Sequence, residues 1–277
     1  MLEKILFNFL WIIVAYLIGS INFSIIFTKN KKNMKNIKEV GSGNAGATNA
    51  ARVYGIKFGV CIFILDASKS FWLGFLLGLL QSNVTAFNVI IPQLSLIFVI
   101  IGHIFPIYFN FKGGKGASCL LGMIASISLF IAAIGTIIFF IIVILTRYVS
   151  LGSIIVPFIL ALLSFLCPYW HNIDSTITNQ IFWFSPLFIF IASIIVTLSH
   201  WQNIGRLIHK KESKIQFINK NQKIKKFYEN KLKINLVNKN KLEKNQKNKI
   251  HTHSIIPDLD SNENNSIIDD AINMKKN

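Results

Sequence analysis

The sequence contains little of what a metal or disulfide site requires. Its 277 residues include only three cysteines, Cys61, Cys119 and Cys167, and these show no CxxC or other ligand spacing. We therefore expect small apolar packing residues at these positions, no metal site and no cofactor. Acidic residues are also scarce, with 12 Asp and Glu against 29 Lys and Arg. The glycine–lysine pattern of a P-loop nucleotide site is absent as well.

Long apolar runs dominate what is present. Hydrophobic residues make up 52% of the chain. Runs of 18 or more apolar residues are typical of transmembrane helices. The first run is too long for the apolar core of a signal peptide, so we expect it to be retained as a span. The sequence therefore predicts an all-α, polytopic membrane protein, with apolar runs near residues 5–27, 58–80, 88–110, 117–146, 149–168 and 181–199.

The distribution of basic residues orients these spans, because short cytoplasmic loops are rich in Lys and Arg. The connection 28–57 carries seven basic residues and the loop 111–116 carries two, whereas 81–87 and 169–180 carry none. The first two connections are therefore expected inside, and the last two outside.

Counting crossings between these loops requires the long 117–146 run to be divided, near Ser126–Ser128. The division gives about seven transmembrane helices, with the N-terminus outside and the C-terminus cytoplasmic. A single tilted helix followed by a re-entrant segment is the alternative. We place residues 1–214 in the membrane domain and expect the Lys- and Asn-rich residues 215–277 to form a disordered cytoplasmic tail.

The first inside connection contains the glycine-rich segment Gly41-Ser-Gly-Asn-Ala-Gly46, followed by Thr48, Asn49 and Arg52. Its Gly-x-Gly-x-x-Gly spacing matches the dinucleotide fingerprint, but that site needs a preceding strand, and here a basic loop precedes it. Backbone N–H groups in such loops can point at an anion. A plain turn needs fewer hydrogen-bonding side chains, so we interpret the segment as a phosphate cradle.

A second glycine-rich loop, Lys112-Gly113-Gly114-Lys115-Gly116, immediately precedes an apolar run. A phosphate bound there would meet free N–H groups, a helix N-terminus and one or two ammonium groups. The alternative is a basic loop whose lysines only extend toward the membrane surface.

Two further groups of polar residues lie on expected helices. Asp66 and Lys69 are three residues apart inside an apolar run; intramembrane charges are functional candidates, although such a pair can also be purely structural. His200, Asn203 and Arg206 recur along one side of the end of the last helix, followed by Glu212. They could present a base, an amide and a guanidinium to one ligand, or serve only as an interfacial anchor.

Together these motifs resemble the bacterial acyl-phosphate:glycerol-3-phosphate acyltransferases of the PlsY type. The similarity extends from about Leu17 to Lys214. Asn22 stands where the family has proline, and Ser118-Cys119 where it typically has Ala-Thr. The segments that carry the resemblance are Gly41–Arg52, Asp66–Lys69, Gly102–Pro106 running into Phe111–Gly116, Ser150–Ser153, and His200–Leu207.

The resemblance implies a seven-helix enzyme of the bacterial inner membrane whose active site faces the cytoplasm. The implied reaction, the first acylation in phospholipid synthesis, moves a fatty acyl group from acyl phosphate to the sn-1 hydroxyl of glycerol 3-phosphate, giving lysophosphatidic acid. The implied partners are these two substrates, membrane lipids and the soluble enzyme that makes acyl phosphate. No nucleic acid partner is expected.

The resemblance also assigns the loop 112–116 to glycerol 3-phosphate. Because an acyl phosphate is already activated, we expect direct transfer without a covalent intermediate. The hydroxyl proton then passes to His200 or to a phosphate oxygen of the donor; the resemblance favours the second route. The expected catalytic residues are Ser42, Asn44, Arg52, His200 and Asn203, and the expected substrate-binding residues are Gly43, Gly46, Thr48, Asn49, Lys69, Lys112, Gly113, Gly114, Lys115, Gly116 and Arg206.

Two other functions are compatible with the residues. An organophosphate transporter would also need helices and cationic pockets, but it would normally place charge near the middle of the membrane. A scaffold that recruits soluble lipid enzymes through its basic tail would require residues 215–277. We rank both below the enzyme, because the motifs cluster at one face.

Overall fold

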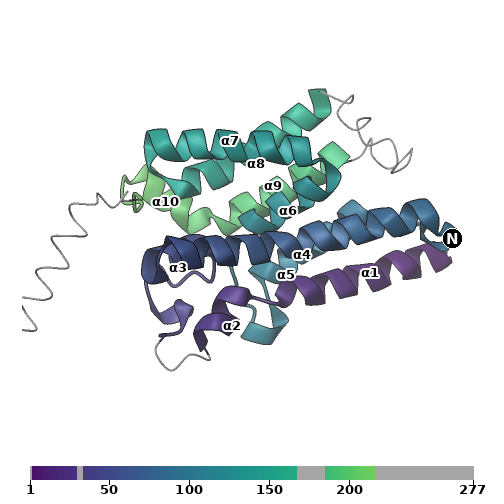
Figure 1. Ribbon diagram of the computed structural model, residues 1–277, viewed down its shortest axis with the longest axis horizontal. Coiled ribbons are helices and arrows are strands. Elements are labelled where there is room, and N and C mark those ends of the chain that lie inside the picture. The colour runs from purple at the N-terminus through teal and green to yellow at the C-terminus, as the bar shows by residue number, and fades with distance from the viewer. Residues whose placement is uncertain (1, 30–33, 167–184, 216–277) are drawn as a thin grey trace, which may run out of the picture. The chain divides into compact units, whose positions relative to one another are not determined.

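A computed structural model describes residues 2–29, 34–166 and 185–215. The expected outside loop 169–180, Cys167 and the tail from residue 216 lie outside these ranges. The described residues form helices and connecting turns without any strand, so the all-α class is confirmed. Ten α-helices and three short 3₁₀ helices make up this part of the chain (Figure 1). They are α1 (Leu2–Ser20), α2 (Phe23–Lys29), η1 (Ile37–Glu39), α3 (Ala47–Tyr54), α4 (Ile56–Asn83), η2 (Thr85–Phe87), α5 (Pro92–Ile104), η3 (Ile107–Phe109), α6 (Ala117–Ile127), α7 (Leu129–Thr146), α8 (Val149–Leu166), α9 (Ser185–Ser199) and α10 (Trp201–Ile208).

Five stretches of the described chain are long and apolar enough to cross a membrane, which confirms the polytopic class. The pair α9 and α10, bent by 64°, makes a sixth if it is one broken span. Helix α6 has 11 residues, about 16 Å of helix, roughly half the hydrocarbon thickness. The expected total of seven crossings and the orientation of the termini therefore stay predictions.

The predicted break in the 117–146 run is confirmed at Ser128. This residue is extended, with φ −154° and ψ 111°, and its hydroxyl accepts a hydrogen bond from the N–H of Ile131 at the start of α7. An N-cap serine of this kind favours a new helix start over continuation of α6.

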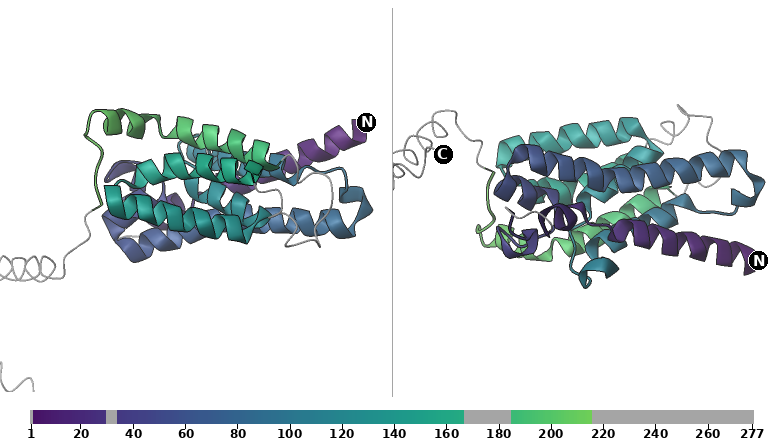
Figure 2. Two further views of the ribbon diagram at one scale, coloured as in Figure 1. Left: turned by 90° about the horizontal axis from the view of Figure 1, so that it is seen from above. Right: turned by 60° about the horizontal axis from the view of Figure 1, so that its bottom comes forward.

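The beginning of α6 and the end of α7 lie at the same end of the molecule. Lys115, just before α6, contacts Asn203 in α10. The carbonyl of Arg147, just after α7, accepts a hydrogen bond from Ile215 N–H. Helices α2, α3 and α10 occupy this end in all three views, opposite the N-terminus (Figures 1 and 2). This end of the molecule, called the polar end below, holds the predicted site.

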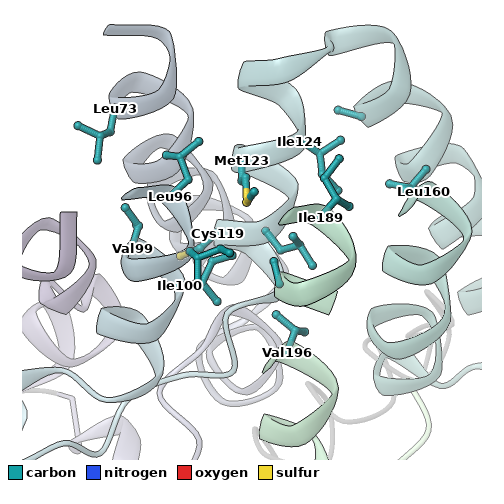
Figure 3. Close-up of a cluster of buried hydrophobic side chains, with 14 of the residues drawn as sticks. Leu73, Leu96, Val99, Ile100, Cys119, Met123, Ile124, Leu160, Ile189 and Val196 are labelled. Carbon is teal, nitrogen blue, oxygen red and sulfur yellow. The ribbon is translucent and has the colours of Figure 1, made fainter. Parts of the chain in front are cut away.

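The apolar core surrounds the short helix α6, whose Cys119, Met123 and Ile124 are at most 2% exposed (Figure 3). They pack among side chains of α4, α5, α8 and α9. Burial of Cys119 agrees with the expectation that it is a packing residue, whereas Cys61 on α4 is exposed and lies outside the buried core. Large apolar side chains elsewhere on α1, α4 and α7 are exposed, as lipid-facing residues of membrane helices are.

Glycines set the close crossing of α1 and α5. A Cβ added at Gly19 would lie 2.2 Å from the carbonyl oxygen of Val99, and one at Gly102 would lie 2.3 Å from that of Tyr16. Neither position leaves room for a side chain. Small residues that allow backbones to touch are a common device for packing membrane helices.

Candidate active site

The break between α1 and α2 connects the first span to the first glycine-rich loop. The amide of Asn22 donates to the carbonyl of Ala45 at 3.1 Å, and its side-chain oxygen accepts from the N–H of Ile25 at 3.1 Å. Asn22 therefore caps α2 and holds the loop with one side chain. The sequence indicated only that Asn22 replaces a proline. An Asn two residues after the end of an apolar helix is also an N-cap signal, and this signal could have predicted the role.

Lys69 lies beneath this break and is 7% exposed. Its ammonium donates to the carbonyl oxygens of Ile21 at 2.7 Å and Gly19 at 3.3 Å. It also lies 3.0 Å from an oxygen of Asp66 and 3.1 Å from Nδ1 of His103. All its hydrogens are thus directed at protein groups. In this structure the Lys69 ammonium satisfies carbonyls freed by the break, and its role in substrate binding stays a prediction.

Asn49 is also turned inward, toward the loop it follows. Its side-chain oxygen accepts from the N–H of Ser42 at 2.9 Å, and its amide donates to the carbonyls of Val40 at 3.0 Å and Ile37 at 3.3 Å. The side chain is 2% exposed. Asn49 therefore shapes the loop, and a substrate contact by its amide would cost these bonds.

The other polar residues of the first loop remain available for a ligand. Ser42, Thr48 and Arg52 are exposed and Asn44 is half-buried. Across the three described ranges, none of their side chains makes a hydrogen bond to the protein. Gly41 and Gly43 have φ of 63° and 70°, a conformation that favours glycine. The loop thus presents a hydroxyl, an amide and a guanidinium outward.

The expectation of free backbone N–H groups is wrong for much of both loops. Gly113 and Gly114 donate to the carbonyls of Ile104 and His103, at 3.1 and 3.0 Å. Gly43 and Gly46 likewise donate to loop carbonyls, at 3.1 and 3.0 Å. The physical reason is that α5 ends beneath the second loop, and its last carbonyls need partners. The N–H groups of Lys115 and Gly116, directly before α6, have no such partner in the described chain.

The glycines of the second loop serve close packing. A Cβ at Gly114 would lie 2.1 Å from Nε2 of His103 and 2.9 Å from the carbonyl oxygen of Ala45. The two glycine-rich loops therefore touch through Gly114 and Ala45. A larger residue would push them apart.

A hydrogen-bonded network joins the second loop to α10 and the segment after it. The ammonium of Lys115 contacts the side-chain oxygen of Asn203, whose amide donates to Oε1 of Glu212 at 2.7 Å. Nε of Arg206 donates to Oε2 of Glu212 at 2.7 Å, and the hydroxyl of Ser150 donates to Oε1 at 2.9 Å. Glu212 therefore fixes the side chains of Asn203 and Arg206 at the end of the chain's last described helix.

The charges of this network shift two pKa values. Burial, followed by the positive charge of Arg206, lowers the pKa of Lys115 to about 8; Glu212 raises it and Arg52 lowers it further. Burial alone would raise the pKa of Glu212, but hydrogen bonds from Arg206, Asn203 and Ser150 hold it below its usual value. The charges that act on Lys115 are thus two cations, Arg206 and Arg52, and one carboxylate, Glu212, so the region is net positive and suited to an anion.

His200 lies in the bend between α9 and α10. The sequence had placed it on a continuous last helix, whereas α9 ends at Ser199 and α10 starts at Trp201. Nδ1 of His200 lies 2.8 Å from the carbonyl oxygen of Val196. Because a carbonyl can only accept, Nδ1 donates, and in the neutral ring the lone pair is on Nε2.

The backbone of Lys112 is bonded to the turn that follows α5. Its backbone N–H donates to the carbonyl of Phe109 at 3.3 Å, the same oxygen that accepts from Nζ of Lys38 at 3.0 Å. The cations that act on Lys115 are Arg206 and Arg52 instead. Several predicted site residues thus lie at the polar end: Ser42, Asn44, Thr48, Arg52, Lys115, Gly116, His200, Asn203 and Arg206. Lys69 is bonded to the break between α1 and α2, and the charge of Lys112 acts on Lys38; the roles of both in substrate binding stay predictions.

Comparison with known proteins places this arrangement in a family. The sequence model of the family described as "Glycerol-3-phosphate acyltransferase" matches residues 9–210. A glycerol-3-phosphate acyltransferase of Mycoplasma mobile is 47% identical over 233 residues, which cover 78% of this chain and 96% of that protein. One of Mycoplasmopsis pulmonis is 39% identical over 223 residues, covering 79% and 97%.

A solved structure shows the same fold. The glycerol 3-phosphate form of PlsY, an integral membrane glycerol 3-phosphate acyltransferase, superposes with a TM-score of 0.63 at 29% identity, covering 76% of this chain and 96% of that one. Its lysophosphatidic acid form gives 0.61 at 28% identity. The chain whose two glycine-rich loops meet at Gly114 and Ala45 belongs to the glycerol-3-phosphate acyltransferase family.

Proposed function

We propose that the protein transfers a fatty acyl group from acyl phosphate to the sn-1 hydroxyl of glycerol 3-phosphate, releasing inorganic phosphate and forming lysophosphatidic acid. The observation that carries this proposal is the contact between the two glycine-rich loops. Gly114 lies against Ala45, so groups on the first loop and Lys115 on the second face one region. Two anionic substrates can meet there.

The acceptor is assigned to Lys115 and its neighbours. The Lys115 ammonium, the Arg206 guanidinium and the free N–H groups of Lys115 and Gly116 can all donate to a phosphate. A phosphate on Lys115 would compete with the contact to Asn203, so the side-chain oxygen of Asn203 would be released to accept a hydrogen bond from an acceptor hydroxyl. An anion at the start of α6 also gains from the helix dipole.

The donor is assigned to the first loop. The Ser42 hydroxyl and the Asn44 amide would bind the acyl-phosphate head group, and Arg52 would balance its charge. In the described chain the Ser42 hydroxyl has no base or carboxylate within hydrogen-bond reach. This supports direct transfer over an acyl-serine intermediate.

Direct transfer of the acyl group requires no reactant besides the donor and the acceptor. The sn-1 oxygen attacks the acyl carbon, the bond from that carbon to the phosphate oxygen breaks, and phosphate leaves. The hydroxyl proton passes to a phosphate oxygen of the donor, or to Nε2 of His200. Holding both reactants in line can itself lower the barrier by several kcal/mol, up to about 10.

We propose that the polar end faces the cytoplasm of a bacterial cell. It carries Lys29, Lys38, Arg52, Lys57, Lys112, Lys115, Arg147 and Arg206, whereas the described turn 84–91 has no basic residue. This asymmetry is the one that marks cytoplasmic loops.

The decisive experiment gives the purified protein glycerol 3-phosphate with either acyl phosphate or acyl-CoA. We expect lysophosphatidic acid acylated at sn-1 with the first donor, and less than about one hundredth of that rate with the second. Equal rates with both donors would refute the donor assignment, and an sn-2 product would refute the regiochemistry.

A further inference from the structure

A second group of cations lies beside the turn that connects α5 to the second glycine-rich loop. Lys38 donates to the carbonyl of Phe109 at 3.0 Å, and its ammonium lies 5.7 Å from the centre of the Phe109 ring. The N–H of Lys112 donates to the same carbonyl. Burial, followed by the charges of Lys112 and Lys29, lowers the pKa of Lys38. Lys29, Lys38 and Lys112 therefore form one group, called the lysine cluster below.

The lysine cluster has no counterion among the described residues. The ion pairs found there involve Asp66 and Glu212, and both carboxylates belong to other groups. Glu39 follows Lys38 in sequence, yet it is exposed and makes no ion pair within the described ranges. Three neighbouring positive charges repel one another, and an external anion would relieve that repulsion.

An apolar surface adjoins these lysines. Phe105 is 53% exposed, Ile107 46%, Tyr108 55% and Phe111 57%. The turn that carries them is held rigidly: the Tyr16 hydroxyl donates to the carbonyl of Phe105 at 2.8 Å, and Phe111 N–H donates to that of Pro106 at 3.0 Å. Aromatic residues exposed at the end of a span are typical of the membrane–water interface.

The backbone at this turn is unusual. Asn110 and Phe111 both have φ of 56°, a left-handed conformation that is uncommon for residues other than glycine. Two such residues in succession cost free energy, and conformations of this kind cluster at functional sites. Here they present an exposed Phe111 directly before Lys112.

We propose that the lysine cluster binds the headgroup phosphate of an anionic phospholipid of the surrounding bilayer, whose acyl chains lie on Phe105, Ile107, Tyr108 and Phe111. The cations meet the phosphate, and the aromatic surface continues into the lipid. A soluble phosphate would use the cations but would leave the apolar surface uncovered. The site is separate from the acceptor site and does not depend on the identity of the acyl donor.

Such a lipid would also act on the catalytic region. Lys112 and Lys115 are linked by Gly113 and Gly114, whose N–H groups are bonded to the end of α5. Fixing Lys112 at the membrane surface thus restricts the segment that carries Lys115. An anionic bilayer should therefore lower the KM for the acceptor and leave kcat nearly unchanged.

The test measures lipid retention directly. Native mass spectrometry of the full-length protein would compare bound phosphatidylglycerol with bound phosphatidylcholine, supplied in equal amounts. We expect at least about fivefold more of the anionic lipid on the wild type. The double variant K29Q/K38Q should lose this preference. The matched control K35Q/K57Q, which removes two exposed lysines outside the cluster, should keep it.

Two further measurements distinguish a lipid phosphate from free phosphate and control for misfolding of the variants. Replacing exposed Tyr108 and Phe111 by serine should lower the retention of phosphatidylglycerol at least about threefold without lowering the melting temperature. Addition of 10 mM inorganic phosphate should leave retention unchanged. The proposal fails if K29Q/K38Q retains as much anionic lipid as the wild type, if the wild type shows no preference, or if free phosphate displaces the lipid.

Discussion

The side-chain oxygen of Asn49 accepts a hydrogen bond from the backbone N–H of Ser42, at 2.9 Å. Through this bond the first turn of α3 fixes the backbone of the residue assigned to the acyl-phosphate head group. Asn44, five residues earlier, makes no side-chain hydrogen bond in the described chain. Two asparagines of one loop are thus expected to act in different ways.

The first prediction compares their alanine variants. Asn49→Ala removes three internal hydrogen bonds from a buried side chain, so we expect a loss of about 2 to 4 kcal/mol of stability together with most of the activity. Asn44→Ala should reduce kcat/KM for the donor about 10- to 100-fold with an unchanged melting temperature. Thermal unfolding in detergent and donor kinetics distinguish the two. A destabilised N44A protein would contradict the assignment of Asn44 to substrate.

The second prediction concerns the contact between the two loops. Gly114→Ala would put a Cβ 2.1 Å from His103 Nε2 in α5 and 2.9 Å from the carbonyl oxygen of Ala45 in the first loop, so the second loop must shift away from both. We expect KM for the acceptor to rise at least about tenfold, because positioning of the two reactants is lost. Gly205→Ala is the control, since a Cβ there meets nothing within 4 Å and alanine favours a helix. Normal acceptor kinetics in G114A would show that the loops need not touch.

The third prediction is a pH dependence of acceptor binding. With the pKa of Lys115 at about 8, its side chain carries a positive charge below that pH and loses this charge as the pH rises above it. KM for glycerol 3-phosphate should therefore rise between about pH 8 and 9.5, whereas the substrate phosphate is already ionised above about pH 6. Lys115→Arg should abolish this alkaline rise, because guanidinium stays charged. A flat profile in the wild type would argue against Lys115 as the phosphate ligand.

The fourth prediction tests which group accepts the proton of the attacking hydroxyl. His200→Gln removes the lone pair on Nε2 and keeps a polar side chain of similar reach. If a donor phosphate oxygen takes the proton, as we expect, kcat should fall only about tenfold, and its pH profile should keep its shape. A general base normally contributes about 100- to 10,000-fold. A loss in that range, with the acidic limb of the profile abolished, would assign the proton to His200.

The fifth prediction addresses the carboxylate that organises α10. Glu212→Gln removes the ion pair to Arg206 and weakens the acceptance of bonds from Asn203 and Ser150. We expect a loss of about 1.5 to 3 kcal/mol. Because the folded state lowers the pKa of Glu212, this stabilisation is present near neutral pH and is lost as pH falls through the lowered pKa. E39Q, at an exposed carboxylate without an ion pair in the described chain, should change neither stability nor its pH dependence.

Local patterns in the sequence predicted several of these features. The length of the 117–146 run and its serines located the break at Ser128 because a helix of that length exceeds one span. The distribution of lysines indicated which connections share a face. The family followed from motifs whose order is preserved along most of the chain.

Long-range contacts could not be predicted in the same way. The N–H groups of Gly113 and Gly114 are occupied because α5 ends beneath them, and no local pattern encodes that contact. The direction of the Lys69 ammonium depends on carbonyls some 50 residues earlier in the chain. No proline or glycine lies at the bend at His200, so the sequence predicted a straight last helix.

The ammonium of Lys69, which satisfies the carbonyls of Gly19 and Ile21, bears on how the protein enters the bilayer during synthesis. Carbonyls without partners are costly in hydrocarbon, so the interrupted first segment is incomplete until the second segment arrives with its charge. The newly made chain should consequently leave the translocation channel as a pair of segments, and Lys69→Met should leave the first one slow to integrate.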